Sequence, residues 1–420
     1  MKKYLSLFLA LAMIFALAAC GSSENPDESP SVAPETDTPD ENLTESDKLY
    51  ATHAPDELVM TVSGSPVYWQ EFFYWINTAK SEVENYTGAI ENWDETSMFN
   101  TEMTNSEFVY DYAMSILRQY RSLEKNISDM DIALNDEDKA YVEEIYQGFA
   151  DSMADGDLEK LENEILPQNH VTADFIKYLN SVERLYNRGF IEIFGDEGAE
   201  VTDEEAIEYL DSADLLYAKH ILVMTIDQTT NEALPEDELA EKKALAEEIL
   251  SKLKAEKDNE KKLALFDELM NEHSEDGGLA SYPEGYIFTA NEMVAEFENG
   301  TRELEPGEIS EIIESSYGYH IILRREITPD TVISSSNGVD YTLRHTSATA
   351  LYDSMVTTWM AEAEIITEPK FESFDIGKFF SSMKTLDDAA TEGEDGEAED
   401  GTDEDGEAEE TPEPEESAAP

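Results

Sequence analysis

The sequence predicts an α+β fold in which a small antiparallel sheet with covering helices is inserted into a mostly α-helical domain. Two observations predict the sheet. Residues 215–223 and 317–323 are short runs of branched and aromatic residues, and each run places one histidine among apolar neighbours. A third observation predicts the helices, because apolar residues recur every three or four positions over long stretches elsewhere in the chain.

Length and charge limit the classes of function. The chain has 420 residues, which is enough for two or three domains with apolar cores. Its formal net charge of -70 argues against nucleic acid as a partner, because a phosphate backbone would be repelled. The same charge favours basic partners.

Residues 1–19 predict a signal peptide, with two lysines followed by an apolar run. The run ends in Leu-Ala-Ala before Cys20, the only cysteine, and this ending resembles the lipobox of bacterial lipoproteins. The resemblance implies that Cys20 carries a lipid and anchors the protein on the extracytoplasmic face of a bacterial, Gram-positive membrane. The alternative is an ordinary cleaved signal that contains a cysteine. A single cysteine leaves the exported chain without an internal disulfide.

Residues 20–56 are rich in Ser, Pro, Glu, Asp and Thr, and this composition predicts a disordered tether. Residues 57–211 are predicted to form a helical domain that opens with a hairpin at 58–69. Thr202 is the expected cap of its last helix. The helices of this domain are expected at 108–123, 136–153 and 171–194.

Residues 212–328 are predicted to form the module that contains the sheet. Two amphipathic helices, at 237–254 and 259–270, should cover it with their apolar stripes. The stripe of the first helix consists of Leu245, Ile249 and Leu253, and that of the second of Leu263, Phe266 and Leu269.

Residues 329–385 form a C-terminal segment that is too small to bury an apolar core by itself. We expect a loop around Asn337-Gly338, a long helix at 343–364 and a strand at 363–367. The segment is therefore predicted to pack back onto the N-terminal helices. Residues 386–420 consist mainly of Glu, Asp, Gly, Ala and Pro, which predicts a disordered acidic tail.

Five motifs in the 212–328 module occur in an order that resembles the parvulin family of peptidyl-prolyl isomerases, over about a quarter of the chain. They are Ala-Lys-His-Ile-Leu-Val at 218–223, Ser-Glu-Asp at 274–276, Glu-Met-Val-Ala-Glu-Phe-Glu at 292–298, Pro-Gly-Glu-Ile-Ser at 306–310 and Tyr-Gly-Tyr-His-Ile-Ile at 317–322. The hairpin with Gly64 and Pro66, followed by an aromatic helix, also looks like the chaperone domain of PrsA-like and SurA-like exported foldases.

The resemblance implies peptidyl-prolyl cis/trans isomerase activity, which requires no cofactor and no metal. The barrier to rotation about the imide bond is about 18–20 kcal/mol. A catalyst must hold the proline ring in an apolar pocket, remove water from the imide and stabilise its twisted form.

The resemblance implies three catalytic residues. His220 and His320 lie on strands that the parvulin topology places side by side in the sheet centre, where the two imidazoles can form a hydrogen bond. Asp276 stands where some parvulins have cysteine and others aspartate. It could hydrogen-bond the substrate carbonyl as a donor or repel that carbonyl into the twisted form, and the sequence does not decide between these roles. The alternative for both histidines is a structural role in the core.

Met293, Phe297 and Phe288 are the candidates for the substrate-binding pocket. Met293 and Phe297 are four residues apart and would share one face of a short helix, with Asn291 as its cap and Gly300 just past its end. Phe288 would contribute to the wall. Core packing is the alternative for such a pair.

The chain departs from the parvulin pattern in two places. Residues 277–286 lack the usual Gly-Gly-Asp-Leu-Gly sequence, so the pocket rim differs and activity could be weak. The segment 225–238 is acidic and would repel a phosphate group, so selectivity for phosphorylated substrates is not expected. His273 is expected to face solvent. No metal site is expected, because the other histidines, which are His53, His170 and His345, lack ligand spacing.

The leading hypothesis is a lipid-anchored, extracytoplasmic foldase that isomerises X-Pro bonds in newly secreted, unfolded and mainly basic clients. The second is a non-catalytic holdase that uses the parvulin-like module only to bind clients. A solute-binding lipoprotein is a third possibility, but it leaves the two histidine strands and the Met-Phe pair unexplained.

Overall fold

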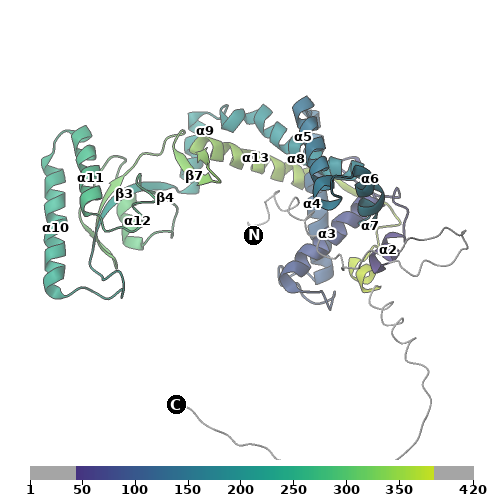
Figure 1. Ribbon diagram of the computed structural model, residues 1–420, viewed down its shortest axis with the longest axis horizontal. Helices are drawn as coiled ribbons and strands as arrows, with labels where there is room; N and C mark the ends of the chain where they lie inside the picture. The colour runs from purple at the N-terminus through teal and green to yellow at the C-terminus, as the bar shows by residue number, and fades with distance from the viewer. Residues whose placement is uncertain (1–43, 383–420) are drawn as a thin grey trace, which may run out of the picture. The chain divides into compact units, whose positions relative to one another are not determined.

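The computed structural model describes residues 44–382 (Figure 1). The predicted signal peptide, Cys20, most of the tether and the acidic tail lie outside the described residues. Within 44–382, no helix is both long enough and apolar enough to span a bilayer.

Contacts divide the chain into two compact units. The first unit comprises 1–117, 159–172 and 365–420, and the second comprises 118–158 and 173–364, as far as these ranges are described. The second unit therefore contains the predicted module together with helices on either side of it in the sequence. The predicted boundaries at 57–211, 212–328 and 329–385 stay a prediction.

A three-stranded sheet in the first unit joins the two ends of the described chain. Strands β1 (Leu58–Val62) and β2 (Ser65–Tyr68) form the predicted antiparallel hairpin, and β9 (Ile365–Thr367) pairs antiparallel with the other edge of β1. The hairpin turn is made by Ser63 and Gly64, which both have positive φ.

An aromatic helix packs on this sheet. The side chains of Trp69, Phe72, Trp75 and Ile76 on α3 are almost completely buried, and the Trp69 indole donates to the Tyr50 carbonyl at 2.8 Å. The helical segments of this unit are α2 (Glu45–Tyr50), α3 (Trp69–Thr87), the start of α4 (Asn105–Asp129), the end of α6 (Leu158–Lys160), the π-helix η2 (Leu161–Ile165), α7 (Leu166–Gln168) and a last helical stretch at 376–382.

One glycine of the second unit permits close packing between helices. A Cβ atom on Gly189 would lie 2.3 Å from the Tyr352 hydroxyl and 2.4 Å from Ile127 Cδ1, so only glycine permits this approach. Thr202 caps α9, as predicted. The helices are the end of α4, α5 (Asp136–Met153), α8 (Ala173–Phe194), the 3₁₀ helix η3 (Asp196–Gly198), α9 (Asp203–Ala213) and α13 (Leu343–Glu362).

The second unit also contains the predicted small antiparallel sheet, in the order β4-β3-β6-β5. The two strands predicted to carry the histidines are its central pair, with Ile221 opposite Ile321. The strands are β3 (Leu216–Met224), β4 (Tyr286–Phe288), β5 (Ile313–Glu314) and β6 (Gly318–Arg324).

Helices cover both faces of this sheet (Figure 1). The predicted helices α10 (Glu236–Ala255) and α11 (Asn259–His273) pack on one face, and α12 (Ala295–Arg302) packs on the other. Leu263 departs from its predicted stripe, since it is 38% exposed. The sheet-facing positions of α11 are Phe266, Leu269 and Met270, so Leu263 lies at the margin of the contact.

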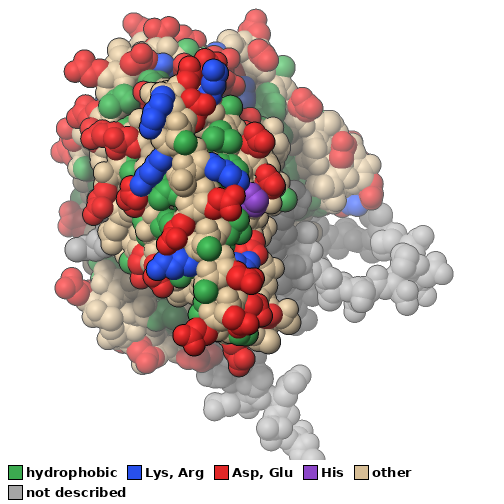
Figure 2. Space-filling model, turned by 90° about the vertical axis from the view of Figure 1, so that its left-hand side faces the viewer, with side chains coloured by type: hydrophobic (Ala, Val, Ile, Leu, Met, Phe, Trp, Pro, Cys, Tyr) green, Lys and Arg blue, Asp and Glu red, His purple; other side chains and the backbone are tan. Residues whose placement is uncertain are grey.

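The outer side of α10 and α11 carries mixed charges. Figure 2 faces this side and shows lysine and acidic side chains interspersed, with small apolar areas between them. Several are paired, as Lys252 is with Glu248 and Lys254 with Glu311. This face therefore presents no extended patch of one sign.

The loop predicted around Asn337-Gly338 is instead the turn of a hairpin. Strands β7 (Val332–Ser336) and β8 (Val339–Thr342) pair antiparallel on either side of these two residues. Asn337 and Gly338 both have positive φ, which an Asn-Gly pair adopts at little cost in a two-residue hairpin turn. The Asn-Gly dipeptide is therefore the sequence feature from which this hairpin could have been predicted.

Candidate active site

Two histidines meet on the α12 side of the sheet. His220 on β3 lies opposite Ile322, and His320 on β6 lies opposite Leu222, so the histidines are diagonal neighbours on one face. Their Nδ1 atoms are 3.0 Å apart, and their rings are nearly parallel. The sheet therefore brings together two residues that are 100 positions apart in the sequence.

Asp276 joins this pair from the segment after α11. Its Oδ2 atom lies 3.1 Å from His220 Nε2, and its Oδ1 atom accepts the Gly278 N–H at 3.1 Å. The backbone before it is fixed to β3, since the Glu275 N–H donates to the Leu222 carbonyl at 2.8 Å. The position of Asp276 is thus set by the central strand of the sheet.

Two further residues extend the polar chain, and the sequence analysis did not identify either of them as part of the site. The Tyr286 hydroxyl donates to Asp276 Oδ2 at 2.6 Å, and Ser315 Oγ lies 2.7 Å from His320 Nε2. The site is therefore a continuous chain of five side chains, Ser315, His320, His220, Asp276 and Tyr286.

A period-two pattern in the sequence could have indicated that Tyr286 belongs to the site. Tyr286 and Phe288 alternate on β4, where they lie opposite Ala218 and Leu216. Both therefore share the face of β3 that carries His220. We find no comparable signal for Ser315, which reaches His320 from the turn before β6.

Glycine at 278 leaves room for the tyrosine. A Cβ atom there would lie 2.0 Å from the Tyr286 hydroxyl, so any other residue would push this hydroxyl away from Asp276. Gly278 thus both donates to the carboxylate and permits its contact with Tyr286.

Donor and acceptor capacity fixes the direction of the bonds. An ionised Asp276 accepts only, so His220 donates from Nε2 and, when neutral, accepts at Nδ1. His320 then donates from Nδ1 and accepts the Ser315 hydroxyl at Nε2. Every polar atom in the chain of five is satisfied by this arrangement with both imidazoles neutral.

The pKa shifts agree with this arrangement. Burial alone would raise the pKa of Asp276, but the hydrogen bonds from His220, Tyr286 and the Gly278 N–H lower it well below its usual range. Burial, together with the neighbouring His220, lowers the pKa of His320 to about 4. Burial and the bond to Asp276 raise the pKa of Tyr286, which therefore stays protonated. At neutral pH the site thus contains a carboxylate and a neutral His320.

The three apolar candidates form one cluster beside the histidines. The Phe297 ring lies 5.0 Å from the His220 ring and 5.7 Å from the Phe288 ring, and Met293 packs against the same cluster. Phe297 and Phe288 are only 3% and 2% exposed, whereas Met293 is partly exposed. Met293 is therefore the member that an incoming apolar group meets first.

The predicted short helix differs in its ends. It begins at Ala295 after Val294, so Met293 lies before the helix rather than on its face. Asn291 does not cap it with its side chain; its backbone N–H donates to Glu298 Oε2 at 2.8 Å. Met293 and Phe297 are thus brought together by the turn that precedes α12.

Gly300 also differs from its predicted place past the helix end, because it lies inside α12. A Cβ atom on Gly300 would lie 2.1 Å from Ile313 Cδ1, so the glycine lets α12 approach β5 closely.

His273 differs from expectation, since it is half-buried at the end of α11 rather than facing solvent. Its Nε2 atom lies 3.7 Å from Glu272. Among residues 44–382, no three or more His, Cys, Asp or Glu side chains are grouped so that they could hold a metal ion.

Comparisons with known proteins agree with this geometry. The family model of the PPIC-type PPIase domain, or rotamase, matches residues 220–326. The chain is 39% identical over 132 residues to foldase protein PrsA of Halalkalibacterium halodurans, covering 30% of this chain and 32% of that protein. It is 34% identical over 129 residues to foldase protein PrsA of Geobacillus kaustophilus, covering 30% and 37%. The matched part thus spans about a third of these curated relatives.

Parts of the chain are also similar to solved structures. The crystal structure of PrsA from Bacillus subtilis is 18% identical, covers 76% of this chain and 98% of that chain, and gives a TM-score of 0.22. The solution structure of TbPIN1 is 27% identical, covers 27% and 97%, and gives a TM-score of 0.20. From the family match and the two curated relatives, the chain contains a parvulin-type, or PPIC-type, peptidyl-prolyl isomerase domain at residues 220–326 and is related to the PrsA foldases through it.

Proposed function

We propose that this protein is an extracytoplasmic foldase that catalyses cis/trans isomerisation of X-Pro bonds in unfolded, newly secreted proteins. The observation that carries the proposal is the buried chain from His320 through His220 to Asp276, which lies directly beside Phe297 in a parvulin-type domain. Of the three candidates for catalysis, Asp276 is proposed to act on the substrate, and His220 and His320 are proposed to hold it in place. Met293, Phe297 and Phe288 are the proposed pocket for proline.

The state of Asp276 favours one of its two chemical roles. Its carboxyl group is ionised and has no proton to donate to a substrate carbonyl, because it already accepts from His220, Tyr286 and Gly278. A fixed negative charge repels the carbonyl oxygen of a planar imide lying against it. The twisted imide turns that oxygen away, so this repulsion lowers the barrier to rotation.

The two histidines hold this charge in place. His220 donates to Asp276, and the orientation of His220 is set in turn by His320 and Ser315. We therefore assign His320 to the positioning of His220 rather than to contact with the substrate, since the His320 side chain is almost completely buried.

A holdase remains the second candidate, and one observation favours it. Phe297 and Phe288 are almost completely covered, so a proline ring would reach mainly Met293 unless neighbouring side chains moved. A module that binds clients without accelerating isomerisation would fit this surface.

We also propose that Cys20 carries the lipid anchor at the outer face of the membrane and that preferred clients are basic. The lipobox-like sequence before Cys20 and the formal net charge of -70 support these two points.

The decisive test is cis-to-trans relaxation of an unphosphorylated Ala-Pro peptide with the chain starting at Gly21. Asp276→Ala and Met293→Ala should each lower kcat/KM by roughly tenfold or more, because one removes the fixed charge and the other the first apolar contact. Asp237→Ala and Met98→Ala, at exposed positions outside the site, should leave it unchanged. A parent protein that prevented aggregation of an unfolded client without accelerating the relaxation would establish the holdase instead.

A further inference from the structure

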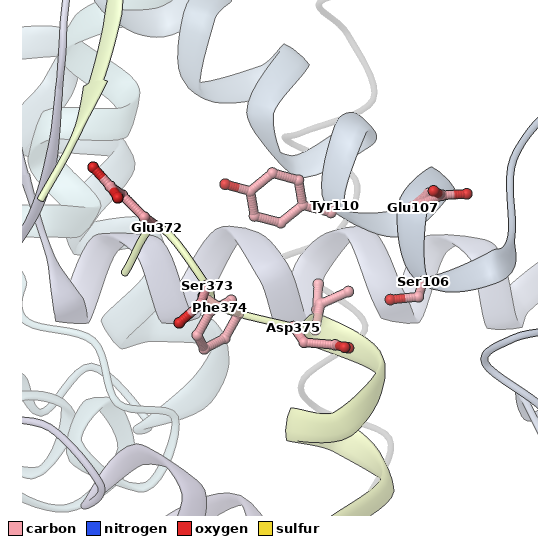
Figure 3. Close-up of a pocket in the computed structure, with 8 residues that line it drawn as sticks. Ser106, Glu107, Tyr110, Glu372, Ser373, Phe374 and Asp375 are labelled. Carbon is pink, nitrogen blue, oxygen red and sulfur yellow. The ribbon is translucent and has the colours of Figure 1, made fainter. Parts of the chain in front are cut away.

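A pocket in the first unit lies outside the isomerase domain. It has a volume of about 330 Å³ and lies between the first turns of α4 and the segment 372–376 after β9 (Figure 3). The two walls are therefore about 265 residues apart in the sequence. No role in the isomerase chemistry described above involves this pocket.

The walls are fixed to each other by a direct bond. The Gly377 N–H donates to Ser106 Oγ at 3.0 Å, immediately after the 372–376 wall. A Cβ atom on Gly377 would lie 2.9 Å from Ser106 Oγ and 3.1 Å from Trp93 Cβ, so the close approach depends on glycine. The fold itself thus fixes the two walls of the pocket to each other.

Two aromatic rings make the apolar part of the pocket. Tyr110 and Phe374 are each partly exposed, and both contact the buried ring of Phe72, with centroids 6.5 Å and 5.3 Å apart. These rings are supported by the core of the unit, so they offer rigid faces to a ligand.

Carboxylates make the polar part of the pocket, and two of them are held in position. Glu107 Oε2 accepts the Thr104 N–H at 2.8 Å, and Asp375 Oδ1 accepts the Lys378 N–H at 2.9 Å. Glu372 is exposed, and among residues 44–382 no lysine or arginine forms an ion pair with it. In Figure 3 the Glu372 side chain lies on the same side of the pocket as the Tyr110 ring.

From this combination we propose that the pocket binds a lysine or arginine side chain of an unfolded client. The apolar stem of such a side chain would lie along Tyr110 and Phe374, and its cationic end would pair with Glu372. A neutral apolar side chain would use the rings alone, and an acidic one would be repelled by Glu107 and Glu372. The charge of Asp375 is already paired with Lys378, whose Nζ lies 2.8 Å from Asp375 Oδ2. The inference rests on the proposed client binding, but it does not require isomerase activity.

The site also gives a local basis for the preference for basic clients. The formal net charge of -70 attracts every cation at long range and distinguishes poorly among positions on a client. The pocket, with its ring faces and the Glu372 carboxylate, would recognise one side chain at a time. It can therefore determine the position along a client at which the first unit binds.

The test compares two fluorescein-labelled peptides of one extended, proline-free sequence that differ only by a central arginine or glutamine. Binding of both to the full chain from Gly21 is measured by anisotropy at 50 mM salt. We expect the arginine peptide to bind about fivefold more tightly and Glu372→Gln to remove most of this difference, as expected for one exposed ion pair. Phe374→Leu should weaken binding of both peptides, because it removes a ring face and keeps the apolar volume.

Glu159→Gln is the matched control, because it removes the same charge from an exposed position of the first unit that does not line the pocket. An equal loss of affinity for the arginine peptide in Glu372→Gln and Glu159→Gln would show a general field effect and would overturn the proposed site. Equal affinity of the parent protein for the two peptides would also overturn it. The Ala-Pro relaxation assay on the same variants separates the two proposals, since Glu372→Gln should leave kcat/KM unchanged even if the pocket binds arginine as described.

Discussion

At the scale of single residues, the site depends on one carboxylate that is stabilised by donors from separate parts of the chain. Asp276 receives hydrogen bonds from His220 on β3, from Tyr286 on β4 and from the nearby Gly278 N–H. Burial opposes ionisation of Asp276, and the three bonds together outweigh it. Loss of any one donor should therefore move the pKa of Asp276 upward.

Replacement of Tyr286 by phenylalanine tests this dependence. Tyr286→Phe keeps the ring and removes the hydroxyl 2.6 Å from Asp276, so the pKa of Asp276 should rise and the acid limb of the kcat/KM profile should move to higher pH. We expect a stability loss of about 1–2 kcal/mol from the missing bond to a charged acceptor. Tyr282→Phe is the control, since Tyr282 packs on Tyr286 but is 55% exposed. An unchanged pH profile in Tyr286→Phe would contradict the proposed positioning role.

The buried His320 predicts a second pH effect. Its pKa is about 4 in the folded protein against 6.5 for an ordinary histidine, so the unfolded chain binds more protons between these pH values. The free energy of unfolding of the domain should therefore fall as the pH is lowered from 6.5 to 4, by up to about 3 kcal/mol in total.

Hydrogen exchange of peptides covering 316–326 measures this loss locally. His320→Gln removes the titrating group, so protection of these amides should depend less on pH below 6.5 than in the parent. Parallel pH dependence in the two proteins would show that His320 is not the group responsible.

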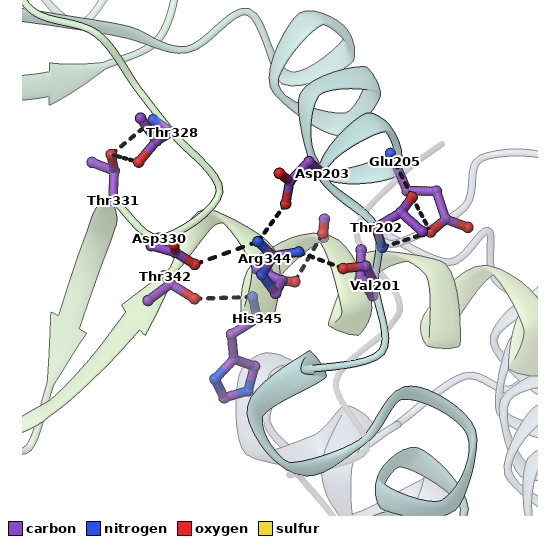
Figure 4. A network of polar contacts seen from close by, with 11 residues as sticks. Val201, Thr202, Asp203, Glu205, Thr328, Asp330, Thr331, Thr342, Arg344 and His345 are labelled. Carbon is purple, nitrogen blue, oxygen red and sulfur yellow. Dashed lines mark hydrogen bonds and ion pairs between the residues drawn. The ribbon is translucent and has the colours of Figure 1, made fainter.

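At the scale of elements, one arginine connects the start of α13 to the segments that flank the isomerase domain (Figure 4). Arg344 donates to the Val201 carbonyl, and it pairs with Asp203 at the start of α9 at 2.6 Å and with Asp330 before β7 at 3.4 Å. The Val201 and Leu343 side chains lie in one buried cluster behind this network. The chain therefore enters and leaves the domain at neighbouring points.

Arg344→Met tests the network. It keeps most of the apolar stem and leaves the Val201 carbonyl without its cationic partner, so we expect a loss of about 2 kcal/mol, within the range for bonds to a charged group. Asp203→Asn removes only the ion pair made by Asp203, whose own side chain is 78% exposed, and should cost less than about 1 kcal/mol. Urea unfolding measures the free energy lost in each variant, and amide hydrogen exchange in peptides from α9 and α13 shows where the loss occurs. Equal costs would mean that the exposed ion pair, rather than the bond to the backbone, carries the interaction.

At the scale of the whole molecule, the C-terminal part of the described chain completes the fold of the first unit. β9 pairs with β1, and Phe371 after it stacks on Trp69 with centroids 6.1 Å apart. In the second unit, α13 packs against α8 and bonds to it through Tyr186 and Asp353 at 2.8 Å. These contacts support our proposal that the 212–328 module is an insertion within a discontinuous helical domain.

Phe371→Ala tests how much the first unit depends on its C-terminal segment. Phe371 is buried against Trp69 and His53, so the substitution should lower the free energy of unfolding of this unit by about 3–4 kcal/mol. Tryptophan fluorescence during urea unfolding reports mainly on this unit, which contains Trp69, Trp75 and Trp93 of the chain's four tryptophans. The exposed Tyr86→Ala is the control and should cost less than about 1 kcal/mol. A similar small effect for Phe371→Ala would show that the segment is dispensable.

The sequence by itself determined the local elements and the family of the domain. Period-two runs predicted β3 and β6, apolar stripes predicted α10 and α11, and the ordered motifs identified His220, His320 and Asp276 as candidates. These features are local, since backbone periodicity and short spacings are written along the chain.

Only the tertiary structure decided which distant residues complete the site. Tyr286 and Ser315 join the polar chain because β4 and the turn before β6 are folded against the central strands. Alternation along 286–288 indicates which face Tyr286 shares with Phe288, but no spacing in the sequence records the contact of Tyr286 with Asp276 or that of Ser315 with His320. The pairing of β9 with β1 and the burial of Phe288 and Phe297 were decided in the same way. Hydrogen bonding and burial depend on distances in space, and strand pairing sets those distances for residues that lie far apart in the chain.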